Sequence, residues 1–290
     1  MVRRYIDSEP TSRLAIWARR VAAFALAAAF LAVIIVRWGP FEEIRPLLAT
    51  FAGALALAIL ALVLAIAAFV VIWREGSGGL GAALTGMAIS FALLAYPAYL
   101  GLRAHRLPWI YDITTDPIDP PRYEALAQLR VRDANPSVYQ GLYAAEQQRS
   151  AYPDIGPLGT NATVQAAYNA VLTVVNKRKD SFLAPYWRIM DARPPLPPRR
   201  EGRIEAVVYS SLLGLRDDVV IRVRAEPEGA RIDARSSSRY GSFDFGANAG
   251  RIRALMNDIE EAIRTQRPER PPQPPPAAKK ATGKKFQRRR

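Results

Sequence analysis

The chain has 290 residues, half of them hydrophobic, and a formal net charge of +14 at pH 7. The charge is concentrated at the two ends: residues 1–106 carry a net +5, residues 107–263 are neutral overall, and residues 264–290 carry a net +9. A neutral central region argues against a nucleic-acid-binding protein, and the absence of cysteine excludes disulfides, thiolate catalysis and cysteine-bound metals.

Residues 1–106 contain three long apolar stretches, and we expect them to form a three-span transmembrane region. The stretches cover Ala15–Val36, Leu47–Trp73 and Leu80–Leu102. About 20 helical residues cross a hydrocarbon core of roughly 30 Å, so each stretch is long enough. The second and third stretches contain no charged residue, which argues against a transporter because ion pathways need such groups.

The first stretch has a second interpretation, a signal peptide that is removed after export. The residues that follow it are Arg37, Trp38 and Gly39, whereas a cleavage site needs small residues. We therefore expect a retained helix. Its N-terminal side is rich in arginine, which favours the cytoplasm: Arg3, Arg4, Arg13, Arg19 and Arg20. Three crossings then place the following domain outside the cytoplasmic membrane, although Arg103 and Arg106 oppose this orientation weakly.

Residues 107–265 have the composition of a soluble domain, and three helices are expected in it. Pro117, Pro120 and Pro121 lack amide donors and restrict their neighbours, so Asp112–Arg122 is expected to form no regular structure. A short helix is predicted over Tyr123–Arg130. The two longer helices are predicted from a Thr160 or Asn161 cap to Lys179, and over Asp244–Thr265 with a buried stripe of Ala249, Ile252, Met256, Ile259 and Ile263.

Four strands are predicted between the two longer helices. They cover Trp187–Met190, Arg203–Leu212, Asp218–Arg224 and Ala230–Ser236, with turns at Gly214–Asp217 and Pro227–Gly229. Apolar and charged residues alternate along them, as in half-buried antiparallel strands. The expected fold class is an α-helical membrane anchor of three transmembrane helices plus an α+β domain, whose antiparallel sheet of three or four strands packs against helices.

Several runs of this domain resemble a known bacterial family. They are Asp112–Tyr123, Tyr152–Asp154, Arg203–Ala206, Leu215–Arg222, Arg231–Arg239 and Gly246–Arg253. Together they are similar to the domain of unknown function 1499 (DUF1499) over about residues 107–263. The resemblance implies an envelope protein, here in the bacterial inner membrane with a periplasmic domain, because similar domains often follow a membrane anchor or export signal. It implies no catalytic residue.

The sharpest local feature is the predicted strand and loop over Arg231–Asp244. Guanidinium groups bind phosphate and carboxylate in two-point contacts, and helix N-termini favour anions. An anion site is therefore one hypothesis for this feature, built from Arg231, Arg235, Ser237, Ser238, Arg239 and the amides near Gly246. The alternative is that Arg222, Arg231 and Arg235 pair with Glu205, Asp218 and Asp233 on a solvated sheet while Asp244 caps the last helix.

Other groups that could carry chemistry have simpler explanations. Asp217 and Asp218 could act as a hydrolytic pair, but neighbouring strand residues point to opposite faces, and we place them in a turn. Asp112, Asp116 and Asp119 could contribute to a calcium site, although turn capping is the preferred interpretation. The single histidine, His105, lies beside the third span. Lys177 and Lys179 lie at a helix end, with nothing to pair them with a catalytic serine.

Residues 266–290 are rich in proline and basic residues, and we expect them to form a disordered tail. The basic residues that could contact anionic lipid or another polyanion are Lys279, Lys280, Lys284, Lys285, Arg288, Arg289 and Arg290. A tail that only improves solubility is the alternative.

These observations lead to an expectation of a non-enzymatic envelope protein with a binding or structural role. The expected partners are the lipid bilayer, anionic lipid or an envelope polymer, and other membrane proteins, with no nucleic acid, cofactor or metal. The alternative is a hydrolase or transferase that acts on an anionic envelope substrate at the Arg235–Asp244 loop.

Overall fold

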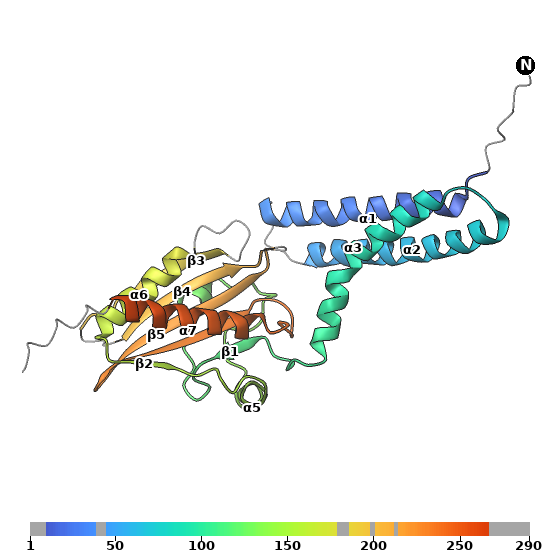
Figure 1. Cartoon of the computed structure of the whole chain (residues 1–290). Coiled ribbons are helices and arrows are strands. Elements are labelled where there is room, and N and C mark those ends of the chain that lie inside the picture. Colours follow the sequence, from blue (N-terminus) through green and yellow to red (C-terminus); the bar gives the residue numbers. More distant parts are fainter. Residues whose placement is uncertain (1–9, 39–44, 179–185, 198–200, 212–213, 267–290) are drawn as a thin grey trace, which may run out of the picture.

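The computed structural model describes residues 10–38, 45–178, 186–197, 201–211 and 214–266. Within these ranges, three long helices come first in the chain and an α+β domain follows, as the sequence predicts (Figure 1). The seven basic residues predicted to contact lipid or a polyanion, Lys279 to Arg290, lie outside the described residues.

The three N-terminal helices pack into a bundle through small side chains. Helices α1 (Arg13–Trp38), α2 (Arg45–Glu75) and α3 (Leu80–Ala104) are each long and apolar enough to cross a membrane. Small residues allow helix backbones to approach closely in a bilayer, where packing rather than the hydrophobic effect drives association. The buried stripes repeat at alternating spacings of three and four residues: Ala15, Ala18, Ala22, Ala25, Ala29 and Ala32 on α1, and Ala54, Ala58, Ala61, Ala65 and Ala68 on α2.

The domain is built on a six-stranded antiparallel sheet. Its four long strands are β3 (Tyr186–Arg193), β4 (Glu201–Tyr209), β5 (Arg216–Glu226) and β6 (Gly229–Ser238), and they pair in chain order. Two short strands, β1 (Asp112–Thr114) and β2 (Leu158–Thr160), both pair with the outer side of β6, at its C-terminal and N-terminal halves respectively.

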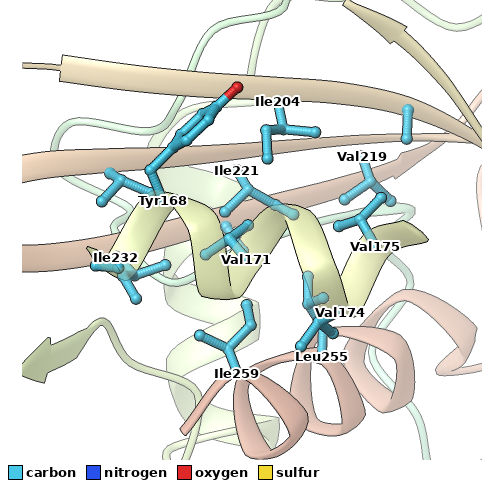
Figure 2. Close-up of a cluster of buried hydrophobic side chains, with 14 of the residues drawn as sticks. Tyr168, Val171, Val174, Val175, Ile204, Val219, Ile221, Ile232, Leu255 and Ile259 are labelled. Atoms are coloured by element: carbon cyan, nitrogen blue, oxygen red, sulfur yellow. The ribbon is translucent and has the colours of Figure 1, made fainter. Parts of the chain in front are cut away.

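Two helices cover one face of the sheet and form the main core with it. Helix α6 (Val164–Lys177) and helix α7 (Ala247–Gln266) lie on this face (Figure 1). Figure 2 shows Val171 and Val175 of α6 and Leu255 and Ile259 of α7 directed at the sheet. The sheet contributes the apolar half of each alternating strand: Ile204, Ala206, Val208, Val219, Ile221, Val223, Ile232 and Ala234. This is the apolar face that the strand alternation predicts.

The opposite face of the sheet carries charged side chains, and the chain between β1 and β2 covers much of it. This connection includes the short helices α4 (Ala125–Gln128) and α5 (Leu142–Ala151). The predicted charged face is therefore present, but its central members are not solvated. Glu205, Asp218, Asp233 and Arg235 are each at most 1% exposed.

Some predicted boundaries are wrong for identifiable reasons. Asp112–Thr114 forms β1, because the proline restriction on Asp112–Arg122 begins only at the residue before Pro117. Asp217, assigned to the Gly214–Asp217 turn, lies inside β5 together with Asp218. Helix α6 is capped by the Thr163 hydroxyl, which accepts a hydrogen bond from the Ala166 amide, rather than by Thr160 or Asn161.

Candidate functional site

The charged face of the sheet holds an ion-pair cluster that contains three of the predicted anion-site arginines. We call it the arginine–aspartate cluster. Its positive members are Arg130, Arg222, Arg224, Arg231, Arg235 and Arg239, and its negative members are Asp112, Asp116, Asp119, Asp218 and Asp233. Alternation along β5 and β6 places their members on one face, β1 supplies Asp112, and the connection after β1 supplies Asp116, Asp119 and Arg130.

The centre of the cluster is the pair between Arg235 and Asp112. Nε and Nη2 of Arg235 donate to the two carboxylate oxygens of Asp112 at 2.9 and 2.6 Å, and both side chains are almost fully buried. The guanidinium also lies against the rings of Tyr123 and Tyr139, with its central carbon 4.6 and 5.4 Å from their centroids. Burial disfavours the charged guanidinium, but its hydrogen bonds to the Asp112 carboxylate, together with electrostatic attraction to Asp112, Tyr123 and Tyr139, outweigh that effect and raise the pKa of Arg235.

Asp218 binds two arginines on the same face. Its Oδ2 accepts from Nε of Arg130 at 2.7 Å, and its Oδ1 accepts from Nε of Arg239 at 2.8 Å. Asp218 and both arginines are at least nine-tenths buried. Such pairs lose much solvation on burial, so they stabilise a fold mainly when every partner remains in place.

A third group of ion pairs joins β5 and β6 to the proline-rich segment after β1. Asp233 accepts hydrogen bonds from Arg222, Arg224 and Arg231. Asp116 and Asp119 complete the group: Arg231 donates to Asp116 at 2.7 Å, and Arg222 and Arg224 donate to Asp119 at 3.0 and 2.9 Å.

The proline-rich segment is also held by turn capping. Oδ1 of Asp116 accepts from the amides of Ile118 and Asp119. Of the three aspartates considered for calcium, Asp116 thus serves as a turn cap, and all three serve as arginine partners. No group of three or more potential metal ligands occurs among the described residues.

The structure does not bring the six predicted anion-site residues to one place. Arg231, Arg235 and Ser237 share the charged face, where the Ser237 hydroxyl accepts from Arg130. Ser238 lies on the opposite face and accepts from Asn248 of α7 at 3.0 Å, because successive strand residues alternate.

Arg239 and Gly246 of the predicted site also have intramolecular partners. Arg239 pairs with Asp218, although its Nη2 atom is buried without a hydrogen-bond partner. The Gly246 amide donates to Oδ1 of Asp244 at 2.8 Å, and the Asn248 amide donates to Oδ2 at 2.9 Å. An internal carboxylate therefore occupies the N-terminus of α7, where an anion was expected to bind. Burial raises the pKa of Asp244, against the lowering effect of these amides.

The remaining candidate groups are separated. Asp217 and Asp218 point to opposite faces, as expected: Asp217 binds Arg251 of α7 at 2.5 Å, whereas Asp218 belongs to the arginine–aspartate cluster. His105 lies just after α3, and Lys177 is the last residue of α6. Lys179 lies outside the described residues.

Two contributions to the charged face were not predicted from the sequence. The Glu205 carboxylate accepts hydrogen bonds from the amides of Glu124, Ala125 and Leu126, so it caps α4 rather than pairing with an arginine. Tyr139 packs on Arg235, and burial, with a smaller effect of Asp112, raises its pKa to about 12. The sequence does show the acidic residues Asp116 and Asp119 before Pro120. It could not show which arginines they bind, because those arginines lie more than 100 residues away in the chain.

The structure also has an open hollow of about 480 Å³ at another place. It lies between the connection from β2 to α6 and the C-terminal half of α7, and its lining includes Leu158, Asn161, Thr163, Glu260 and Arg264. None of the predicted anion-site residues lines it.

Comparison with known families identifies the domain. The model of the family described as "Protein of unknown function (DUF1499)" matches residues 112–259. The chain belongs to this family. The match includes all eleven members of the arginine–aspartate cluster and stops before the predicted tail. Among curated proteins the comparison found no match.

Three of the solved structures similar to this DUF1499 chain are the following. Protein MLL2253 from Mesorhizobium loti is 10% identical with a TM-score of 0.30, and the alignment covers 38% of this chain and 95% of that one. Protein CV1439 from Chromobacterium violaceum is 9% identical with a TM-score of 0.24, covering 38% and 93%. Protein NE0264 from Nitrosomonas europaea is 15% identical with a TM-score of 0.22, covering 38% and 92%.

Proposed function

We propose that this DUF1499 protein presents its domain on the outer face of the bacterial inner membrane, where it binds or organises an envelope component without catalysing a reaction. The observation that carries the proposal is that the arginines of the arginine–aspartate cluster form ion pairs with its aspartates. Its arginines bind protein carboxylates, with Arg235 and Asp112 at the centre. Removing one partner of such a buried pair leaves an uncompensated charge, so these arginines are engaged in holding the covered sheet face together rather than in holding a substrate.

The three helices support a membrane location, and the arginines before α1 and in its N-terminal part support a cytoplasmic N-terminus. Paired fusions at the C-terminus test the orientation. A periplasm-dependent phosphatase should be active there, and a fluorescent protein that folds only in the cytoplasm should be dark. The reverse result would contradict the outer-face assignment.

The binding role is tested by identifying what copurifies with the chain. The full chain should be crosslinked in native membranes and purified with its bound lipids and proteins. We expect a reproducible envelope lipid, polymer or membrane protein that is lost when surface residues of the domain are changed. Turnover of an anionic envelope substrate by the purified chain would instead favour the hydrolase or transferase. The present geometry gives that alternative no support, because the arginines of its proposed loop bind aspartates and the hollow lies elsewhere.

The basic tail is proposed to add electrostatic attraction to anionic lipid or another polyanion. Each basic residue near an anionic surface contributes about 1 kcal/mol, and added salt screens the effect. The full chain and a variant with the seven lysines and arginines from Lys279 to Arg290 changed to glutamine should differ in vesicle binding at low salt. Equal binding at every salt concentration would contradict this part of the proposal.

A further inference from the structure

An exposed aromatic cluster lies where the chain leaves α3 and enters the domain. It consists of Trp109, Phe243 and Phe245, and we call it the aromatic cluster. The rings of Trp109 and Phe243 are stacked with centroids 4.9 Å apart, and the Phe243 and Phe245 centroids are 4.5 Å apart. Trp109 remains 61% exposed and Phe245 37% exposed. Exposed aromatic groups of this kind mark interaction surfaces.

The backbone of the loop holds this cluster in a defined arrangement. Phe245 has a φ of 53°, the only positive value among the non-glycine residues that the structure describes. The left-handed conformation costs roughly 1–2 kcal/mol in a residue with a side chain. Asp244 stabilises it by accepting the Gly246 and Asn248 amides, and its own amide donates to the Ile110 carbonyl. A strained backbone that keeps an aromatic ring exposed indicates a use for that ring.

The aromatic cluster is close to the membrane because of its position in the chain. Trp109 follows the last residue of α3, Ala104, by only five residues. Five extended residues reach no more than about 18 Å. The loop that carries the two phenylalanines is tied to the same segment, since Gly246 lies near Leu107 and Asp244 binds Ile110. Figure 1 shows this end of the domain beside the lower part of α3.

The neighbouring residues have the composition of a membrane interface. Tyr96, Tyr99 and Leu102 are exposed on the last turns of α3, and Arg103 and Arg106 are exposed just beyond them. Tyr and Trp concentrate at the headgroup level, and arginines there attract anionic lipid. The indole N–H of Trp109 donates to the Ser242 hydroxyl at 3.1 Å. The polar edge of the ring is therefore already bonded, while its faces remain apolar.

We propose that the aromatic cluster inserts into the headgroup region of the leaflet from which α3 emerges and docks the DUF1499 domain on the bilayer surface. The occupant of this apolar surface is phospholipid. The docking requires only that α3 crosses the membrane, so it is independent of whether that leaflet faces the periplasm. A failure of the topology test would leave this proposal standing, and a failure of the docking test would leave the topology standing.

The absence of cysteine makes a direct test practical. Phe245→Cys in the full chain is labelled with a fluorophore and placed in nanodiscs that contain one copy each. The matched control is Glu228→Cys, because Glu228 is exposed in the turn before β6, at the opposite end of that strand from the loop. We expect lipid-attached quenchers to quench the label at 245 several-fold more than the label at 228, and aqueous iodide to show the reverse.

Three results would overturn the proposal. Equal iodide quenching at 245 and 228 would place the aromatic cluster in water. Protection of position 245 only in discs that hold two copies would identify a second chain as the occupant. Protection that is lost only when a copurified protein is removed would identify that protein instead. If Phe245→Cys fails to fold, Trp109→Cys is the second labelling position, because its backbone is not strained, and the same outcomes apply.

Discussion

At the scale of single residues, the domain depends on buried charges whose partners come from distant parts of the chain. Arg235 of β6 binds Asp112 of β1, and Asp218 of β5 binds Arg130 and Arg239. Removing one member of such a pair leaves an uncompensated charge in a region of low dielectric constant. Replacing both members by apolar groups removes that penalty.

Arg235→Met should therefore destabilise the domain strongly. We expect the free energy of unfolding to fall by about 3–5 kcal/mol, the usual effect of breaking a buried ion pair. The double variant Asp112→Leu/Arg235→Met should lose less than the single variant. Urea unfolding of the full chain in detergent, followed by tryptophan fluorescence, measures both. As a control, Arg188→Ala on the exposed side of β3 should change the value by less than about 0.5 kcal/mol. A single variant as stable as the wild type would contradict the structural role of the cluster.

The pair between Arg253 and Asp154 predicts a pH dependence. Two hydrogen bonds of 2.5 and 2.7 Å from Arg253 lower the pKa of Asp154. Because the carboxylate has a lower pKa in the folded state, its stabilising effect is present above the ordinary carboxylate pKa and disappears as pH falls through the folded value. Asp154→Asn should reduce stability at neutral pH by less than about 1 kcal/mol, since the pair is half exposed. The two proteins should become equally stable in acid, as measured by urea unfolding at a series of pH values. A difference that persists unchanged in acid would contradict this assignment.

At the scale of elements, small side chains decide how the membrane helices pack. Gly86 of α3 contacts the backbone of α1 so closely that an added Cβ would lie 2.9 Å from the Ala18 carbonyl carbon. Gly81, one and a half turns earlier on the same helix, has no atom within 4 Å of such a Cβ. Both glycines thus lie in the same apolar helix, but only Gly86 is in close contact with another helix.

Gly86→Val should separate α1 from α3, whereas Gly81→Val should not. We expect the first change to destabilise the bundle by about 1–3 kcal/mol, the usual cost of overpacking. The midpoint of helix loss in sodium dodecyl sulfate, followed by circular dichroism, compares the two variants directly. Equal midpoints would show that α1 and α3 are not in this contact.

At the scale of the whole molecule, the elements fall into two packed groups. The substantial contacts of α1, α2 and α3 are with one another, and those of α6, α7 and the strands are within the domain. Two units joined by a short connection are expected to unfold separately.

Full chain in detergent should therefore show two transitions. Urea should remove the tertiary signal of the domain while the bundle keeps its helical signal, because helices in an apolar environment retain their hydrogen bonds. Arg235→Met should shift only the first transition, in which the domain unfolds. Gly86→Val should shift only the second transition, in which the bundle loses its helical signal. One transition that both variants shift would show that the two units are coupled.

Local pattern accounts for much of the fold. Apolar length predicted the three membrane helices, and alternation predicted the apolar faces of β4, β5 and β6. The short strands β1 and β2 have three residues each, too few to show a period. The sequence also did not predict that the chain between β1 and β2 covers the charged face. Charged residues such as Arg222 and Asp233 alternate along β5 and β6 in the same way whether water or protein lies above them.

The sequence by itself therefore determined the kinds of element, the two faces of the sheet and the membrane character, since these follow from periodicities within a single segment. Only the tertiary structure decided which aspartate each arginine binds, and that Ser237 meets Arg130 while Ser238 meets Asn248. It also decided that Trp109 meets Phe243 and Phe245 beside the third membrane helix. Pairs such as Arg235 with Asp112 and Trp109 with Phe243 are more than 100 positions apart, and chain folding rather than local pattern brings such residues together.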